Sequence, residues 1–443
     1  MSKNTIYYVD RDLSHSGLYS FQKQHAPAAR ELGYRFVSLI EKGHPHPQRS
    51  QSLSDEVIEL DMLTTERFET LLRERNDAIL LCTYPGQHAP GLDVHLEIEI
   101  AAKRLGLPIR RSDGLRRAND KALMRQTLAE KGVPSAAFAK INSRNELDAA
   151  SKTISFPVIL KPVAGAGSAL TRRCNSPEEL ASHYAQFCDR FASVGLAAQF
   201  SGVSDGVGAA LVEELLEGVE LTVECIVFKG KPHGLIVNEK LHVSYEKSTV
   251  LEHLLVSPPT GLSQEDIRAV KAYAEEVLLA LDLSDTLVHL ELFLTVNGPR
   301  VIEVNPRVGG FEVPREFRQF LNINPFHTGL NLLLGRMSDE EMAEIVKRSQ
   351  DVQPHHAMFV IYPPKSGFLL GLEGVKDAAK LDGICDFSEH LTDNWIDIDS
   401  AEHFVAKFWA KVESADNARR LYDSACATVR PIMSETSAQR ASG

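Results

Sequence analysis

Residues 289–307, HLELFLTVNGPRVIEVNPR, restrict the fold more than any other part of the sequence. Apolar and polar side chains alternate on either side of a central Asn-Gly-Pro. Such alternation predicts two antiparallel strands with one face toward a core. Because Pro299 cannot donate a hydrogen bond to the ladder, we expect a three-residue loop at residues 297–299. This loop sets Glu291 opposite Asn305.

The expected register gives one face of the hairpin an oxygen-rich set of side chains. Glu291, Glu303 and Asn305 project from that face, with Arg307 next to them. Two carboxylates and an amide oxygen suit Mg²⁺ when the ion also binds phosphate oxygens. The simpler alternative is a solvated face of an amphipathic hairpin, because exposed polar residues are common on antiparallel sheets.

The chain before residue 119 alternates segments typical of strands and helices. Residues 6–9, 35–40 and 78–83 are short apolar runs, and a helix is predicted near residues 96–105. This order is typical of βαβ units around a parallel sheet. No G-x-G-x-x-G follows the first strand, so we expect no dinucleotide site of the Rossmann type there.

The pattern changes from residue 119 onward. Asn119 is the expected N-cap of a helix that ends at Lys131. An apolar strand then ends in Lys161 and leads into a small-residue loop at residues 165–169. Further segments are predicted as strands at 210–216, 220–228 and 234–241, a helix at 265–281, and strands from about 356 that lead to a final amphipathic helix.

The composition argues against several other classes of protein. Lys and Arg number 48 against 60 Asp and Glu among 443 residues, and the net charge of −12 disfavours binding to nucleic acid or to an anionic membrane. No apolar run reaches the roughly 18 residues of a membrane span, and the N-terminus lacks a signal-peptide pattern. The six cysteines include no C-x-x-C pair, which disfavours a disulfide framework or a zinc cluster. We therefore expect a soluble cytoplasmic enzyme.

These elements together resemble the ATP-grasp superfamily over residues 119–334. The family pattern has a lysine that opens the small subdomain, a strand-end lysine before a Gly-rich loop, an E-E-x-L-type hinge, a glutamate shortly after it, and finally E…E-x-N-x-R. Their common order is far more specific than any single motif. In this chain the elements are Lys121, Lys161 with residues 165–169, the hinge at 213–216, Glu220, and Glu291 with Glu303, Asn305 and Arg307.

The resemblance implies an α/β fold of the α+β ATP-grasp type, built from three parts. An N-terminal parallel-sheet, Rossmann-like domain would occupy residues 1–118. A small lid subdomain would occupy residues 119–211. An antiparallel-sheet ATP-grasp domain would occupy residues 212–443, with a C-terminal extension from about residue 336.

The resemblance also implies an ATP site. Lys121 and Lys161 would contact the α- and β-phosphates. The loop with Gly165, Gly167 and Ser168 would cover the β- and γ-phosphates with backbone N–H groups. The alternative for each lysine is a solvated surface residue, although Lys161 ends an apolar run, where an ammonium needs a partner. The alternative for the glycines is an ordinary turn.

The hinge would bind adenine, and the residue that follows it would bind the ribose. Glu213, Glu214 and Leu216 would meet the adenine edge, and Glu220 would accept hydrogen bonds from the ribose hydroxyls. Alternation does not decide which glutamate faces adenine, whereas the family spacing to Glu220 favours Glu213. The alternative for this segment is a charged strand edge without a ligand.

The acidic hairpin would hold Mg²⁺, with Mn²⁺ as a substitute, through Glu291, Glu303 and Asn305. In the family, the arginine at the position of Arg307 is catalytic, because it stabilises the acyl phosphate and the oxyanion of the tetrahedral intermediate. The alternative for Arg307 is an ion pair with Glu303 or Glu316.

The reaction that the resemblance implies is the ATP-dependent ligation of a carboxylate and an amine. The layout is similar to the L-amino acid ligases in its H-x-E and N-P-R-x-G-G patterns and its C-terminal extension. Arg315 would clamp an amino-acid carboxylate, with His289 and Gly310 also at the substrate. Arg315 is equally well explained as a surface residue paired with Glu312 or Glu316, and His289 as a hydrogen-bonded strand histidine.

Two other classes stay open. One is a different ATP-grasp enzyme, although the chain has neither the biotinyl-acceptor Met-Lys-Met expected for a biotin-carboxylase-like protein nor the N-terminal phosphate loop expected for a purine-pathway enzyme. The other is a non-catalytic ATP-binding protein, which the intact metal residues argue against. The expected partners are small-molecule amino acids or their derivatives, whose identity and order the sequence leaves open. Homodimers are common in the family, so a second copy of the chain is a further expected partner.

Overall fold

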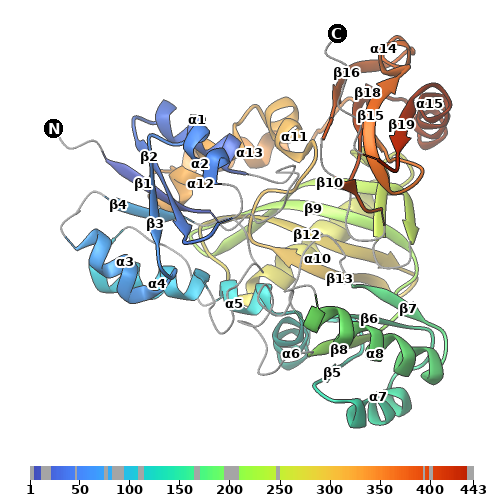
Figure 1. Cartoon of the computed structure of the whole chain (residues 1–443), viewed down its shortest axis with the longest axis horizontal. Helices are drawn as coiled ribbons and strands as arrows, with labels where there is room; N and C mark the ends of the chain where they lie inside the picture. The colour runs from blue at the N-terminus through green and yellow to red at the C-terminus, as the bar shows by residue number, and fades with distance from the viewer. Residues whose placement is uncertain are drawn as a thin grey trace.

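The computed structural model describes most of the chain (Figure 1). Within the described residues the strands form four sheets. None of the helices there has the length and apolarity that a membrane span requires. The described residues are 4–10, 21–44, 47–73, 78–81, 94–107, 114–163, 170–193, 209–245, 250–392, 395–398 and 403–436.

The N-terminal sheet is parallel, as the alternation of strands and helices predicts. Its order is β3 (Glu56–Leu60), β2 (Arg35–Glu41), β1 (Thr5–Val9) and β4 (Ala78–Leu81). β1 and β2 are buried along nearly their whole length, whereas β3 is half-buried and carries two glutamates, so no apolar run marks it in the sequence. The helices of this part are α1 (Gln22–Glu31), α2 (Pro47–Leu53), α3 (Thr65–Leu72), α4 (Val94–Leu105) and α5 (Gly114–Asn119).

The helix α6 (Lys121–Lys131) begins one residue later than expected. Its N-cap is Asp120, whose side chain accepts a hydrogen bond from the backbone N–H of Leu123 at 2.9 Å. Asn119 is instead the last residue of α5, so the expected N-cap is wrong. Asn and Asp cap helices equally well, and the sequence offers both in succession.

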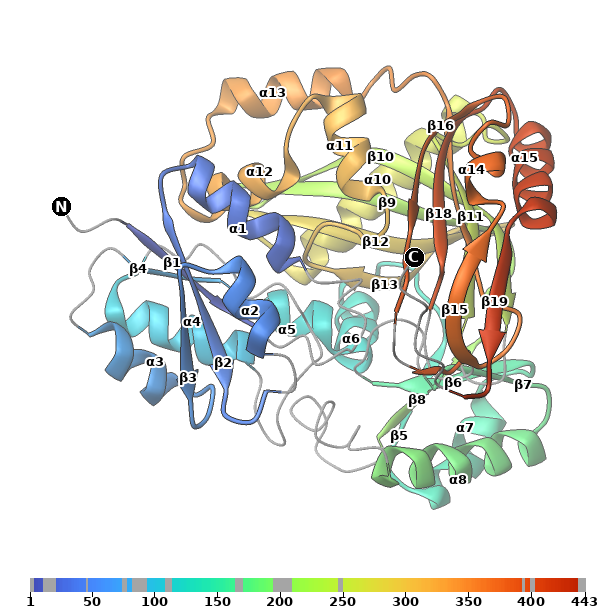
Figure 2. The same cartoon turned by 45° about the horizontal axis from the view of Figure 1, so that its top comes forward.

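The second sheet is small and antiparallel. The helices α7 (Leu147–Thr153) and α8 (Pro177–Ser193) cover the face that carries Val158 and Leu160 (Figure 2). Because side chains alternate along a strand, Lys161 projects from the opposite face, and so does its neighbour Glu213. The order of this sheet is β5 (Phe138–Ile141), β8 (Ala210–Glu214), β6 (Val158–Pro162) and β7 (Arg172–Cys174).

The largest sheet has eight antiparallel strands and forms the floor of the site described below. The helix α10 (Gln264–Leu281) packs on one face, whereas α11 (Val313–Leu321) and α12 (Pro325–Leu333) pack on the other. α13 (Asp339–Arg348) follows them. The strand order is β13 (Gly298–Asn305), β12 (Thr286–Thr295), β9 (Val219–Phe228), β10 (Lys231–Tyr245), β11 (Val250–Ser257), β14 (His356–Ile361), β18 (Ala406–Lys411) and β16 (Ile384–Glu389).

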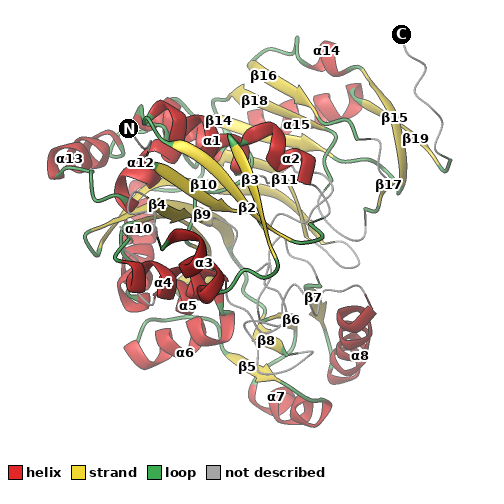
Figure 3. Cartoon of the chain, turned by 60° about the vertical axis from the view of Figure 1, so that its left-hand side comes forward, coloured by secondary structure: helices red, strands yellow, loops and turns green. Residues whose placement is uncertain are grey.

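The C-terminal extension belongs largely to the same sheet, because β14, β18 and β16 continue it beyond β11 (Figure 3). The extension adds a three-stranded sheet of β17 (Trp395–Ile396), β15 (Gly367–Glu373) and β19 (Arg430–Ser434), with helices α14 (Val375–Ala378) and α15 (Ala415–Thr428). β19 follows α15, so the expectation that the chain ends in a helix is wrong. The strand was missed because Arg, Pro and Ser dominate its sequence.

The three predicted domains remain a proposal, and the strands show where their limits fall. The limit between residues 211 and 212 lies inside β8, which pairs with β5 and β6 of the small sheet. The start of the extension near residue 336 lies just before α13.

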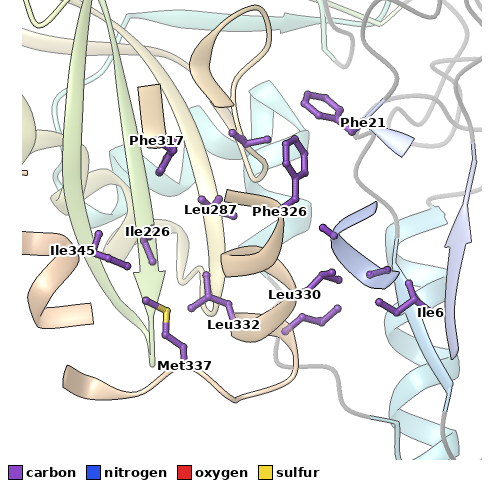
Figure 4. Close-up of a cluster of buried hydrophobic side chains, with 14 of the residues drawn as sticks. Ile6, Phe21, Ile226, Leu287, Phe317, Phe326, Leu330, Leu332, Met337 and Ile345 are labelled. Atoms are coloured by element: carbon purple, nitrogen blue, oxygen red, sulfur yellow. The ribbon is translucent and has the colours of Figure 1, made fainter. Parts of the chain in front are cut away.

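An apolar cluster joins the N-terminal sheet to the large sheet (Figure 4). It includes Ile6 of β1, Phe21, Phe326 of α12 and Ile226 of β9, none of them more than 7% exposed. The rings of Phe21 and Phe326 lie 6.3 Å apart. The N-terminal part is therefore packed against the α12 side of the large sheet, which brings Phe21 next to the loop that follows β13.

Candidate active site

The β12–β13 hairpin has a shorter turn than expected. Thr295 pairs with Gly298, which leaves a two-residue turn at residues 296–297. Pro299 then lies opposite Leu294. The expected three-residue loop is therefore wrong. Pro299 is tolerated because β13 is an edge strand, where a missing N–H can face away from the sheet.

A β-bulge at Ile302 compensates for the short turn. Leu292 pairs with Val301, but the next pair is Glu291 with Glu303. Ile302 is therefore an extra residue on β13. Without it, Glu303 would project from the other face of the sheet, since a one-residue slip reverses every side chain.

The bulge brings the predicted metal residues onto one face. Glu291 lies directly opposite Glu303, and His289 lies opposite Asn305. The expected pairing of Glu291 with Asn305 is wrong by two residues, and a shift by two keeps the same face toward the site. Arg125 of α6 donates from Nη2 to the backbone oxygen of the bulged residue at 3.1 Å, which holds the bulge in place.

Lys240 of β10 lies at the centre of this acidic face. Its side chain is 2% exposed, and its Nζ lies 2.8 Å from Glu220 Oε1, 2.5 Å from Glu252 Oε1 and 2.8 Å from Glu291 Oε2. An ammonium has three N–H donors, so each carboxylate occupies one of them. Burial lowers the pKa of a lysine, but the three carboxylates outweigh burial and raise the pKa of Lys240 well above its ordinary value.

Glu291 and Glu252 respond differently to the same lysine. Burial favours the neutral form of Glu291, but Lys240 and His289 outweigh it and lower the pKa of Glu291 to about 2. Burial raises the pKa of Glu252 despite its contact with Lys240. Glu291 is therefore the more strongly ionised of the two, as a cation ligand should be.

The two lysines expected to bind phosphate are buried, and each is paired with a glutamate. Lys121 Nζ lies 3.0 Å from Glu303 Oε1, and Lys161 Nζ lies 2.5 Å from Glu213 Oε2. Arg125 Nε donates to the other oxygen of Glu213 at 2.6 Å. Burial raises the pKa of this carboxyl, but the two cations outweigh it and lower the pKa of Glu213 to about 2. Burial lowers the pKa of Lys161.

The other described residues of the expected ATP site lie on β8, on β9 and in the connection between them. Glu214 and Leu216 are half-buried beyond the buried Glu213, and Glu220 is held by Lys240. Both oxygens of Glu213 face cations. Outside the described residues lie Gly165, Gly167 and Ser168.

His289 joins a buried polar chain beside the acidic face. Its Nδ1 lies 2.5 Å from Glu224 Oε1, and its Nε2 lies 3.7 Å from Glu291 Oε1. Burial opposes protonation, but Glu224 outweighs it and raises the pKa of His289. A Cβ at Gly309 would lie 2.7 Å from His289 Nδ1, so only glycine allows the loop with Gly310 to pass so close to the imidazole.

The polar chain continues to α11. Asn238 Nδ2 donates to Thr222 Oγ1 and to Glu316 Oε2, each at 3.1 Å. Burial and the charge of Glu224 raise the pKa of Glu316 well above its ordinary value. The Glu316 side chain thus contacts Asn238 rather than either arginine that the sequence offered as its partner.

Arg307 lies between the acidic face and the N-terminal part. Its Nη1 donates to the backbone oxygen of Val308 at 3.0 Å, and its guanidinium lies 5.3 Å from the centre of the Phe21 ring. Its charge acts on the neighbouring groups, since it helps to lower the pKa of Glu291 and opposes protonation of His289.

Arg315 lines a groove of about 530 Å³ between α11 and the strands β16 and β18. Its Nη2 lies 2.6 Å from Asp386 Oδ2 and its Nη1 lies 3.4 Å from Glu312 Oε2. The guanidinium lies 5.4 Å from the centre of the Trp409 ring. The expected pairing with Glu312 is present, and Asp386 is a second partner. The other charged residues of the groove are Arg318 and Lys407.

The groove and the acidic face lie on the same side of the large sheet. Lys240 pairs with Leu255, Leu255 with Met358, and Met358 with Trp409, so the four form one row across four strands. Residues directly opposite each other in an antiparallel ladder share a face. The floor between the two sites is apolar, because Phe311 packs against the cluster of Leu255, Met358 and Trp409.

Several site residues escaped the sequence analysis, although some left a signal. Glu224, Asn238 and Lys240 interrupt apolar strands, which is the signal that singled out Lys161. Arg125 left no such signal, because charged residues are ordinary in helices. The residues that were missed are Arg125, Thr222, Glu224, Asn238, Lys240 and Glu252.

The face offers oxygen ligands rather than a complete metal cage. Among the described residues, no group of three or more His, Cys, Asp or Glu side chains has a metal-binding arrangement. Glu291 and Glu303 do supply two opposed carboxylates, and the amide of Asn305 is two residues further along the same face. Such a set fits Mg²⁺ if the ion takes its remaining ligands from phosphate and water.

Comparison with known proteins identifies the central part of the chain. Residues 154–315 match the ATP-grasp domain. An uncharacterised protein of Sinorhizobium fredii is 22% identical over 81% of this chain and 71% of its own length. Carnosine synthase 1 of Homo sapiens is 27% identical over 48% of this chain and 26% of its length. The L-arginine-specific L-amino acid ligase of Bacillus subtilis is 25% identical over 49% of this chain and 50% of its length.

The chain thus spans 26% of the length of carnosine synthase 1 and 50% of the length of the L-arginine-specific ligase. The likeness to solved structures covers nearly the whole of this chain. An L-amino acid ligase from Bacillus licheniformis has a TM-score of 0.74 and 16% identity, with 98% of this chain and 100% of that chain covered. The biotin carboxylase domain of a Hydrogenobacter thermophilus carboxylase, solved with MgADP, has a TM-score of 0.65 and 16% identity, with 98% and 91% covered. The expected α/β fold class is confirmed. The match to the ATP-grasp domain covers both Lys161 and the acidic hairpin, two of the elements on which the sequence resemblance rests.

Proposed function

We propose that the protein is an ATP-dependent ligase that joins the carboxylate of one amino acid, or amino-acid derivative, to the amine of another. The observation that carries the proposal is the pair of opposed glutamates, Glu291 and Glu303, on one sheet face within reach of buried lysines. The ATP-grasp domain and the likeness to amino-acid ligases support the same reaction class.

The buried lysines would bind the nucleotide by exchanging partners. Lys121 and Lys161 would leave Glu303 and Glu213 for phosphate oxygens, so that no ammonium becomes an unpaired buried charge. Glu220 is assigned to the ribose hydroxyls. Departure of Lys161 would free one oxygen of Glu213 while Arg125 stays on the other, so we assign the adenine amine to the hinge backbone and to Glu213, as the spacing to Glu220 favours.

Glu291, Glu303 and Asn305 would hold Mg²⁺, with Mn²⁺ as a substitute. When bound, the ion would neutralise charge on the transferred phosphoryl group. The carboxylate of the first substrate attacks the γ-phosphorus of ATP, the bond to the bridging oxygen of ADP breaks, and an acyl phosphate forms. The amine of the second substrate then attacks the acyl carbon, phosphate leaves, and the nitrogen loses a proton. Arg307 supplies positive charge for the acyl phosphate and for the oxyanion that follows.

The groove at Arg315 is our candidate for one substrate. Its walls carry both signs of charge, Arg315 and Lys407 against Glu312 and Asp386, above the aromatic ring of Trp409. An amino acid has the matching carboxylate, ammonium and apolar parts. Nδ1 of His289 is bound to the buried carboxylate of Glu224. We therefore assign His289 a supporting role next to Glu291 rather than a contact with the substrate.

The test is ADP and phosphate release from Mg-ATP across a matrix of amino-acid pairs, with mass spectrometry of each active pair. We expect pair-dependent ADP release and a product one water lighter than the two substrates combined. ADP release with one acid alone would indicate an activated carboxylate that awaits a different amine. Silence across the matrix with intact ATP binding would contradict the proposal and favour a purine-pathway or biotin-carboxylase type of reaction.

Two matched variants separate the metal assignment from a general effect of charge. Glu291→Gln and Glu252→Gln each remove one carboxylate partner of Lys240, but only Glu291 belongs to the opposed pair. We expect Glu291→Gln to lower turnover at least about 100-fold, because a bound metal supplies several kcal/mol of charge stabilisation. We expect Glu252→Gln to lose far less. Equal losses in the two variants would argue against Glu291 as a metal ligand.

A further inference from the structure

Both glutamates of the opposed pair already have a lysine as partner. Lys121 contacts Glu303, and Lys240 contacts Glu291. The two lysines differ in how firmly they are held. Lys121 is the first residue of a helix, and a phosphate would be its new partner. Lys240 lies in the middle of a strand with all three N–H groups on carboxylates and almost no exposed surface.

Both oxygens of Glu291 have a nitrogen donor group close by. Its Oε2 accepts from Lys240 at 2.8 Å, and its Oε1 lies 3.7 Å from His289 Nε2. A divalent ion that binds Glu291 has to approach this ammonium closely, and like charges at such separation repel strongly in a buried site. Lys240 cannot turn away from Glu291 toward solvent without also breaking its ion pairs with Glu220 and Glu252.

We propose that Lys240 is a built-in cation that keeps divalent metal ions away from Glu291 until a nucleotide is bound. The inference rests on the proposed function only in taking Glu291 as a metal ligand. In the nucleotide-free protein, Lys240 and Lys121 neutralise the opposed pair, and a metal ion gains little by entering. A bound triphosphate draws Lys121 from Glu303 and adds several negative charges, which tips the balance in favour of the ion. Metal and nucleotide would therefore bind together, with the nucleotide required for tight metal binding.

The test measures Mn²⁺ binding to the full chain with and without a non-hydrolysable ATP analogue. The electron paramagnetic resonance signal of the free ion reports how much Mn²⁺ stays unbound. We expect the wild type to bind Mn²⁺ tightly only with the analogue. We expect Lys240→Met to bind Mn²⁺ at least tenfold more tightly than the wild type when no nucleotide is present. Lys240→Arg keeps the charge and should behave as the wild type. Lys229→Met, which removes an exposed lysine paired with Asp339, is the control for net charge.

A double variant locates the gained site. Glu291→Gln added to Lys240→Met should abolish the extra Mn²⁺ binding. Thermal unfolding gives a second readout, because Mn²⁺ should raise the melting temperature of nucleotide-free Lys240→Met more than that of the wild type. If Lys240→Met does not fold, Lys240→Gln removes the same charge and keeps hydrogen-bonding capacity.

The outcomes separate this inference from the proposed function. If Lys240→Met binds Mn²⁺ no more tightly than the wild type, while the analogue still promotes Mn²⁺ binding, the inference is wrong and the metal site stands. The inference is also wrong if the wild type binds Mn²⁺ equally well with and without the analogue. If no form binds Mn²⁺ even with the analogue, the metal site itself is wrong, and the inference falls with it.

Discussion

Arg125 resembles any surface arginine in the sequence of its helix, yet its side chain has no exposed surface. Its Nε donates to Glu213 of the small sheet, and its Nη2 donates to the carbonyl of the bulged Ile302 on the large sheet. A buried guanidinium is costly unless it is paired. Through these bonds one residue contributes both to the ionisation of Glu213 and to the shape of the β12–β13 hairpin.

The pairing of Glu213 predicts how stability depends on pH. Although burial raises its pKa, Arg125 and Lys161 outweigh burial and bring the pKa of Glu213 to about 2, below its ordinary value of 4.5. A lowered carboxyl pKa stabilises the fold above the unfolded pKa, and this contribution is lost as the pH falls from about 4.5 to about 2. At pH 7 we expect Glu213→Gln to be less stable than the wild type by up to about 3 kcal/mol.

Urea unfolding of the two proteins at several pH values between 7 and 2 checks this prediction. The difference in the free energy of unfolding should be constant above about pH 5 and should shrink below it. A difference that stays the same down to pH 2 would mean that Glu213 does not owe its ionisation to the two cations.

At the scale of the element, the bulge on β13 decides which face Glu303 and Asn305 occupy. Deleting Ile302 removes the extra residue, so Glu303 would turn toward the apolar side beneath the hairpin. We expect the deletion to destabilise the protein by several kcal/mol, since a carboxylate enters the core. We also expect it to abolish nucleotide-dependent Mn²⁺ binding. The matched variant Ile302→Ala keeps the residue count and should keep Mn²⁺ binding.

Denaturant unfolding and Mn²⁺ titration of both variants test the role of the bulge. A deletion variant that still binds Mn²⁺ with the nucleotide analogue would contradict this role. It would show that the hairpin can adopt another register that keeps Glu303 and Asn305 on the same face as Glu291.

The hairpin also shows how far sequence reasoning reaches. Alternation predicts both strands, whereas the shared polar face of Glu291 and Glu303 depends on the expected loop length. The short turn and the bulge at Ile302 could not be predicted, because a bulge depends on a bond from a distant helix and leaves alternation nearly intact. The short turn and the bulge together shift the pairing by two residues from the expected register. A shift by two keeps the same side chains on the same face, so the predicted face is the observed one.

Which charged side chains are buried is the second property that the sequence predicts only in part. The apolar run that ends in Lys161 predicts a partner for its ammonium, and the ion pair with Glu213 confirms this. Lys240 has the same signal, but it lies in a strand for which the family pattern offers no motif. Glu252 lies three strands away from Glu291 in the sheet order, so no local pattern could connect them.

At the scale of the whole molecule, the C-terminal extension is not a separable module. Its strand β14 pairs with β11, and β18 and β16 follow in the same sheet. Ending the chain after Gln350 would leave the edge of β11 unpaired and expose Leu254 and Val256, which are fully buried. An unpaired apolar edge is a site of aggregation. We therefore expect this truncated protein to be insoluble.

Size-exclusion chromatography and the soluble yield of two truncations provide the test. Removing only residues 437–443 leaves every described element in place, so this control should keep the melting temperature of the full chain. A soluble, folded protein that ends at Gln350 would contradict the role of the extension in closing the sheet.

The row of residues from Lys240 to Trp409 gives the distance between the acidic face and the groove at Arg315. Neighbouring strands are about 4.8 Å apart, so three spacings separate the acidic face from the groove by about 14 Å. That distance equals about four residues of extended peptide at 3.3–3.6 Å each. If the proposed function holds, a substrate that reaches from Arg315 to the acidic face has to match this length, so size as well as charge would select among the molecules that are accepted.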